Sequence, residues 1–117
     1  MNKTVLLNNR ELSDVEVQSA RGAIVAMGKE LIERKLVAGS WGNISVKIAD
    51  GVYAVTPSGR GYANQEPKDI VIIDNACSTL DGELTPSSES KLHTAIYKAC
   101  PEAKAIIHTH SIYASAL

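Results

Sequence analysis

Two histidines separated by a single threonine, His108 and His110, are the residues best suited to chemistry. They end an apolar run, residues 105–107, that is typical of a β-strand. Alternate side chains of a strand lie on the same face, so both imidazoles would project to one side, where neutral imidazole can bind a divalent metal. The pair therefore indicates a metal site, with surface or hydrogen-bonded histidines as the alternative.

A second candidate is Ser87-Ser88-Glu89, which follows Pro86 at the expected start of a helix. The hydroxyls of Ser87 and Ser88 and the unpaired backbone N–H groups of a helix start could bind an anion. Glu89 would place a carboxylate beside that anion. The alternative is that these residues only cap the helix.

Two further loops, Gly42-Asn43-Ile44-Ser45 and Thr56-Pro57-Ser58-Gly59, could present amide, hydroxyl and N–H donors to a phosphate. Each could equally be a simple turn. His93, in the expected second helix, is interpreted as a structural hydrogen-bonding residue and is left out of the site.

The first of the elements that would position these residues is a helix beginning at Ser13. Ser13 and Glu16 form a capping-box pattern, in which each side chain would bind the other residue's backbone N–H. Gly39 predicts a stop after Leu36. Apolar residues at spacings of three and four predict one core-facing stripe: Val17, Ala20, Ile24, Met27 and Leu31.

The rest of the chain mixes strands with one more helix. Residues 44–56 predict a hairpin around Asp50-Gly51, and residues 70–73 predict a buried strand. Residues 75–85 read as turns, and residues 105–110 as a last strand. The second helix, ended by Pro101, would carry one apolar side: Leu92, Ala95, Ile96 and Cys100.

The length predicts a single domain over residues 1–117. Strands mixed with helices suggest the α/β class, in which the early hairpin argues against an all-parallel sheet. The sequence stops soon after Ser111, a predicted helix cap, so we expect the fold to be truncated at its C-terminus. Twelve basic and 13 acidic residues give a net charge of -1, which disfavours nucleic acid as a partner. No segment is apolar enough to enter a membrane, and Cys77 and Cys100 predict free thiols in a cytoplasmic protein.

Taken together and in this order, the motifs resemble those of the class II aldolase/adducin family: Gly42-Asn43-Ile44-Ser45, Thr56-Pro57-Ser58-Gly59, Asp69-Ile70-Val71, Pro86-Ser87-Ser88-Glu89, Leu92-His93 and His108-Thr109-His110-Ser111. The resemblance covers residues 13–117. It implies a three-layer α/β/α fold with a central mixed, largely antiparallel sheet, and a homotetramer with active sites between subunits.

The resemblance also implies a site. Zn2+, or another divalent metal, would be held by three histidines, of which His108 and His110 are two and the third would fall beyond Leu117. Glu89 would be an additional ligand in the absence of substrate and the acid/base of the reaction. The substrate phosphate would be bound by Asn43, Ser58, Gly59, Ser87 and Ser88.

The reaction implied by the resemblance is retro-aldol cleavage of a ketose 1-phosphate, of the fuculose 1-phosphate type, to dihydroxyacetone phosphate and an aldehyde, with the metal as electron sink. Four alternatives stay open: a pentulose-phosphate 4-epimerase, a related dehydratase, a non-catalytic adducin-like binding module and an inactive truncated fragment. Glu89 favours the aldolase over the epimerases, which are expected to have aspartate there.

Overall fold

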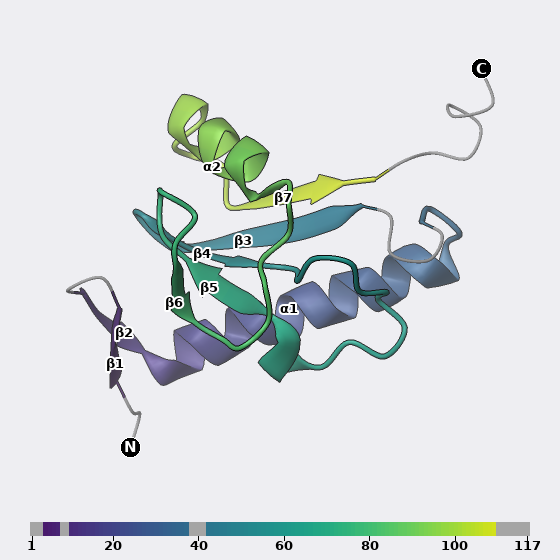
Figure 1. Ribbon diagram of the computed structural model, residues 1–117, viewed down its shortest axis with the longest axis horizontal. Coiled ribbons are helices and arrows are strands. Elements are labelled where there is room, and N and C mark those ends of the chain that lie inside the picture. The colour runs from purple at the N-terminus through teal and green to yellow at the C-terminus, as the bar shows by residue number, and fades with distance from the viewer. Residues whose placement is uncertain (1–3, 8–9, 38–41, 110–117) are drawn as a thin grey trace.

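The computed structural model describes residues 4–7, 10–37 and 42–109, and side chains from residue 12 onward within those segments (Figure 1). Seven strands, two α-helices and one short 3-10 helix lie in these segments. In chain order they are β1 (Thr4–Leu7), β2 (Arg10–Ser13), α1 (Asp14–Glu33), β3 (Asn43–Ala49), β4 (Val52–Val55), η1 (Pro67–Asp69), β5 (Val71–Ile73), β6 (Thr79–Asp81), α2 (Ser90–Ala99) and β7 (Ala105–His108).

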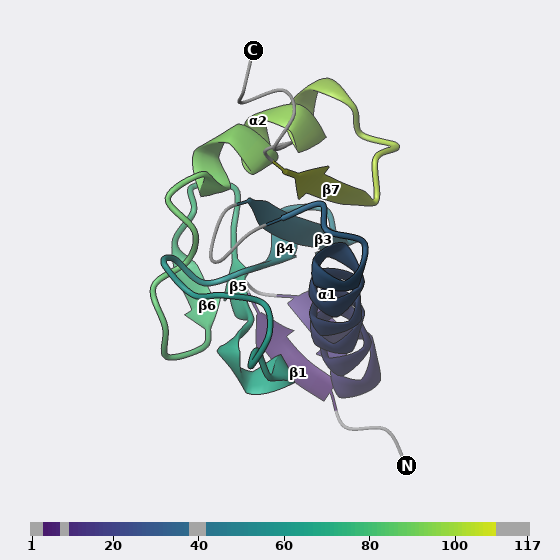
Figure 2. The same ribbon diagram turned by 90° about the vertical axis from the view of Figure 1, so that its right-hand side faces the viewer.

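Five strands form the central sheet, in the order β6-β5-β4-β3-β7. Every neighbouring pair in this described sheet is antiparallel. Helix α1 covers one face and α2 lies against the other, as the two perpendicular views show (Figures 1 and 2). The predicted α/β class and three-layer α/β/α arrangement with a largely antiparallel sheet are confirmed.

Helix α1 begins as predicted but ends earlier. Ser13 is the N-cap, although its hydroxyl accepts from the Val15 N–H at 3.2 Å rather than from that of Glu16. The helix ends at Glu33, three residues before the expected end at Leu36. The reason is local: Lys35 adopts a left-handed φ of 58°, and the Leu36 N–H turns back to the Leu31 carbonyl at 2.9 Å. Gly39, the predicted stop, lies outside the described residues.

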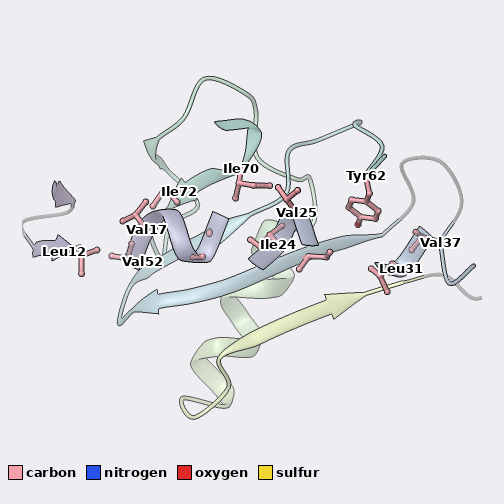
Figure 3. Close-up of a cluster of buried hydrophobic side chains, with 13 residues drawn as sticks. Leu12, Val17, Ile24, Val25, Leu31, Val37, Val52, Tyr62, Ile70 and Ile72 are labelled. Atoms are coloured by element: carbon pink, nitrogen blue, oxygen red, sulfur yellow. The ribbon is translucent and has the colours of Figure 1, made fainter. Parts of the chain in front are cut away.

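The larger core forms between α1 and the sheet (Figure 3). Val17, Ala20, Ile24 and Leu31 are buried and Met27 is partly buried, which confirms the predicted stripe. Their partners are apolar residues from β3, β4 and the β5 region: Ile44, Val52, Ala54, Ile70 and Ile72. Burying one such aliphatic side chain contributes about 1.5–3 kcal/mol, so this contact holds α1 to the sheet.

Helix α2 buries a different side from the predicted one. Leu92 is 45% exposed, Ala95 and Cys100 are exposed and Ile96 is half-buried. The buried residues are instead Ser90, His93, Thr94 and Tyr97. Tyr97 stacks on Tyr53 of β4 with ring centroids 4.7 Å apart. The apolar pattern gave the wrong face because this interface is built largely from polar side chains that bond to each other.

Sequence patterns missed two sheet elements. Residues 75–85, expected to be turns, contain the short edge strand β6, and β1 pairs antiparallel with β2 in a separate small sheet. β6 is attached partly through Arg21 of α1, a buried side chain whose guanidinium contacts Asp81 at 2.7 Å and donates to the Ile70 carbonyl at 3.1 Å. The described residues include no helix long and apolar enough to span a bilayer.

Ile24 offers a test of the core. It is fully buried, so Ile24→Ala should lower the free energy of unfolding by about 2–5 kcal/mol through lost burial and the cavity left behind. Val15→Ala, on the same helix but 55% exposed, is the matched control and should change it by less than about 0.5 kcal/mol. Urea denaturation measures both values, and equal losses would contradict the described packing of α1.

Candidate functional site

The site begins where β3 and β7 pair. Asn43, the first residue of β3, is the register partner of His108, the last residue of β7. The strands approach closely here because Gly42 precedes Asn43 with a φ of 92°. A Cβ at residue 42 would lie only 2.5 Å from the His108 carbonyl oxygen. Strand pairing therefore fixes an amide beside an imidazole.

Backbone contacts bring two more predicted loops to the same end of the sheet. Pro57 and Pro86 form an isolated antiparallel bridge. On either side of it, the Ser58 N–H donates to the Thr85 carbonyl at 2.8 Å and the Ser87 N–H donates to the Thr56 carbonyl at 2.9 Å. This ladder places the loop carrying Ser58 and Gly59 beside the loop carrying Ser87 and Ser88.

A side chain ties the first of these loops to β3. The Ile44 N–H donates to Thr56 Oγ1 at 3.2 Å, and the Thr56 N–H donates back to the Ile44 carbonyl at 3.0 Å. Thr56 is buried, so both bonds are shielded from water. The predicted loop at residues 42–45 is mostly part of β3, and the other two loops are connected to that strand.

Ser87 organises the start of α2. Its hydroxyl accepts from the Glu89 N–H at 3.2 Å, and its carbonyl accepts from both the N–H and the hydroxyl of Ser90, at 3.1 and 2.7 Å. Ser87 is buried whereas Ser88 is exposed. The N-cap of α2 is Glu89, which makes no side-chain cap bond, so Ser87 orders the turn before the helix instead of capping it. Its hydroxyl accepts here and still has a proton to donate, so phosphate binding stays a prediction.

Glu89 faces His108 across the site. The Glu89 Oε2 and His108 Nδ1 atoms are 3.9 Å apart, and the side chains are 45% and 31% exposed. This is too long for a hydrogen bond. In a tetrahedral zinc site, ligand atoms about 2.0–2.2 Å from the metal lie roughly 3.3–3.6 Å apart, so the pair is close to the spacing of two ligands of one ion.

The described residues do not form a complete metal site. Across residues 12–37 and 42–109, no three His, Cys, Asp or Glu side chains gather into a metal-binding group. His110 lies outside the described residues, so its predicted place beside His108 stays a prediction. A carboxylate and an imidazole are suitable zinc ligands, and on that chemistry the described pair fits part of a ligand set.

His93 is the residue whose link to the site sequence reasoning missed. It is 1% exposed, its Nε2 bonds to Asn43 Oδ1, and its Nδ1 lies 2.6 Å from Ser45 Oγ. The prediction of a structural hydrogen-bonding role is confirmed. The available signal was spacing: His93 follows Glu89 by four residues, which places both on one face of a helix.

Burial sets the protonation of His93. Its pKa is lowered to about 4, chiefly because burial disfavours the charged imidazolium; His108 lowers it in the same direction and the Glu89 carboxylate opposes them. His93 is therefore neutral at neutral pH, with one ring nitrogen that donates and one that accepts.

The structure thus brings together Asn43, Ser87, Glu89 and His108, from β3, the start of α2 and the end of β7. Ser58, Gly59 and Ser88 lie on the two bridged loops and are exposed. This arrangement offers an anion several donors and the start of a helix, close to a carboxylate and an imidazole.

The chain is similar to known proteins in both sequence and fold. Residues 22–117 match the family described as Class II Aldolase and Adducin N-terminal domain. A methylthioribulose-1-phosphate dehydratase of Methylococcus capsulatus is 38% identical over 100 residues, covering 86% of this chain and 48% of that protein. A 5-deoxy-D-ribulose 1-phosphate aldolase of Bacillus thuringiensis serovar kurstaki is 38% identical over 102 residues, with the same two coverages.

A solved structure of an L-fuculose 1-phosphate aldolase has a similar fold. It superposes with a TM-score of 0.78 at 35% sequence identity, covering 85% of this chain and 47% of that one. The chain spans about half the length of each of these proteins.

The depressed pKa of His93 predicts acid sensitivity. The unfolded chain would bind a proton on this histidine below about pH 6.5, whereas the native state would not until about pH 4. The contribution to stability is therefore complete above pH 6.5 and is lost as pH falls towards 4, by up to about 1.4 kcal/mol per pH unit. Urea unfolding in the presence of EDTA, repeated between pH 4 and pH 7, measures this change in the free energy of unfolding. His93→Gln, which does not titrate, should show a shallower dependence, and an equal slope would contradict the assignment.

Proposed function

The chain belongs to the class II aldolase and adducin N-terminal domain family, and on this premise we propose that it is the phosphate- and metal-binding part of an enzyme that cleaves a ketose 1-phosphate. The products would be dihydroxyacetone phosphate and an aldehyde. One observation carries the proposal: the candidate acid/base Glu89, the candidate ligand His108 and the candidate phosphate donors Asn43 and Ser87 converge at one end of the sheet, although they come from separate segments.

The proposed phosphate-binding residues include no lysine or arginine, so the phosphate would be bound by neutral donors. The donors are the Asn43 amide, the Gly59 N–H and the hydroxyls of Ser58, Ser87 and Ser88. The N-terminus of α2 adds a partial positive charge. Neutral donors held by backbone ladders need little rearrangement on binding, which supports a preformed phosphate site.

His108 and His110 would hold a divalent metal, which we propose to be zinc, and Glu89 would be an additional ligand only in the absence of substrate. Bound there, such an ion supplies Lewis-acid stabilisation of negative charge on the substrate's carbonyl oxygen. The closeness of the Glu89 carboxylate to the His108 imidazole supports this assignment.

Glu89 would move the proton. Its backbone N–H is held by the Ser87 hydroxyl, so the carboxylate is positioned relative to one of the phosphate donors. When the C–C bond breaks, the hydroxyl group that becomes the aldehyde loses its proton and the carbon that retains the electron pair gains one, so no proton is gained or lost overall. Glu89 would deliver the proton to carbon from its carboxyl group. The same residue would remove that proton in the reverse, bond-forming direction.

A dehydratase is the second candidate, because the dehydratase relative is as similar as the aldolase relative. Both reactions suit a phosphorylated ketulose, a metal and an acid/base. Incubating the intact protein with L-fuculose 1-phosphate, 5-deoxy-D-ribulose 1-phosphate and methylthioribulose 1-phosphate separates them. Release of dihydroxyacetone phosphate supports the aldolase, and loss of water from the intact substrate supports the dehydratase. If neither product forms, the adducin-like binding role is favoured.

We further propose that the protein is a cytoplasmic homotetramer with sites between subunits. Support comes from apolar residues that the described chain leaves uncovered. Leu92 on α2 and Ile107 on β7 are 45% and 48% exposed, and β7 is the edge strand of the described sheet. Cys77 and Cys100 are free thiols, which suits a reducing compartment.

The metal assignment predicts that His108→Ala loses zinc, because a ligand is removed. The metal content of the purified intact protein, measured by inductively coupled plasma mass spectrometry, should fall from about one zinc per subunit to near zero. Ser88→Ala, on an exposed residue outside the ligand set, is the control and should retain the metal. Full occupancy in His108→Ala would remove His108 from the ligand set.

The proton-transfer role predicts that Glu89→Gln lowers kcat by about 10²–10⁴-fold, because the amide cannot donate the required proton. Bound zinc and KM should change little by comparison. Glu83→Gln, an exposed glutamate outside the site, is the matched control and should keep full turnover. A Glu89→Gln enzyme with near-normal kcat would show that another group moves the proton.

A further inference from the structure

A row of four buried polar side chains connects the site to the α2–sheet interface. Asn43 and Ser45 alternate along β3 and so project from the same face, while His93 and Tyr97 are one turn apart on α2. All four are at most 5% exposed. The contacts run from Tyr97 OH to Ser45 Oγ at 2.8 Å, from Ser45 Oγ to His93 Nδ1 at 2.6 Å, and from His93 Nε2 to Asn43 Oδ1.

The direction of every hydrogen bond in this row follows from its last member. The carbonyl oxygen of Asn43 can only accept, so His93 must carry its proton on Nε2 and donate it. A neutral imidazole then has an unprotonated Nδ1, which accepts from the Ser45 hydroxyl. Since the Ser45 proton is used there, its oxygen accepts from the Tyr97 hydroxyl. The donors therefore all point from the core towards Asn43.

The contact between His93 Nε2 and Asn43 Oδ1 also leaves the other end of the Asn43 amide for a ligand. With Oδ1 engaged by His93, the Nδ2 group is left as a donor, and within the described residues no hydrogen bond occupies it. The opposite orientation would turn a carbonyl oxygen towards the anion and repel it. An amide not held on one side could adopt either orientation.

We propose that His93 is a positioning residue that holds the Asn43 amide with its NH2 group directed at the substrate phosphate, and that Ser45 and Tyr97 fix the histidine tautomer that makes this possible. The inference rests on the proposed function, because it needs a phosphate beside Asn43. His93 itself touches no substrate. Its effect passes through one hydrogen bond, to Asn43.

The burial of the row supports this role. A half-satisfied polar group in such an interior would be costly, so the four members hold one another in a single arrangement. His93 is kept neutral by burial, and burial also raises the pKa of the Tyr97 hydroxyl, which keeps it a donor. At neutral pH, neither His93 nor Tyr97 is expected to gain or lose a proton.

The first test reads the tautomer directly. Long-range ¹⁵N–¹H correlation NMR of the imidazole, on the intact protein with His93 assigned, distinguishes a protonated Nε2 from a protonated Nδ1. We expect the Nε2–H form, with and without inorganic phosphate. An Nδ1–H form would reverse the whole row and overturn the inference, whatever the protein catalyses.

The second test separates positioning from packing with two amides of different length. In His93→Gln the side-chain nitrogen can take the place of Nε2 and still donate to Asn43, whereas His93→Asn can satisfy Ser45 but does not reach Asn43. Inorganic phosphate is the probe, titrated by NMR in the presence of zinc. We expect His93→Gln to bind within about threefold of the parent and His93→Asn to bind about tenfold or more weakly, the size of one charged hydrogen bond.

Three results would decide the matter. Equal weakening in both variants would mean that His93 only fills space, and would overturn the inference. If the parent protein binds no phosphate, both the proposed function and the positioning role of His93 fail. If the parent binds phosphate but shows the Nδ1–H tautomer, only the positioning role fails. If KM is close to the parent value in His93→Gln but raised in His93→Asn, while kcat is the same in both variants, the positioning role holds for the substrate as well.

Discussion

The alternation of side chains along β3 is the constraint on which both halves of this molecule depend. Ile44 projects towards α1 and is fully buried in the larger core, whereas Asn43 and Ser45 project towards α2 and bond to His93. A shift of one residue in the pairing of β3 with β7 would exchange these faces. The register that buries the apolar residues is therefore the same register that sets Asn43 beside His108.

How much of the fold the sequence could predict depended on how apolar each interface is. The α1 stripe and the β3–β4 hairpin were predicted correctly because aliphatic periodicity and an Asp-Gly turn are strong local signals. The buried side of α2 was predicted wrongly because His93, Thr94 and Tyr97 are buried through hydrogen bonds and ring stacking. β6 was missed since a three-residue edge strand has too little pattern to be seen.

The types of residue in the candidate site could be predicted from the sequence, but their arrangement in space could not. Ser87 and the histidine pair carry local signals of a helix start and a metal-binding strand, yet their grouping with Asn43 and Ser58 came from family resemblance. Their closeness depends on contacts between distant segments, such as the ladder around Pro57 and Pro86, which no local periodicity contains. The spacing of four residues could place His93 near Glu89, but the hydrogen bond from His93 to Asn43 spans 50 residues of sequence and no local spacing predicts it.

Gly42 has a consequence for how this protein can vary. It has no functional group, but any side chain there would collide with the His108 carbonyl and push β7 away from β3. A mutational scan scored on turnover would rank Gly42 with the reacting residues, although it contributes nothing but the absence of a Cβ. The space left by this missing side chain keeps the two strands, and with them Asn43 and His108, in their observed pairing.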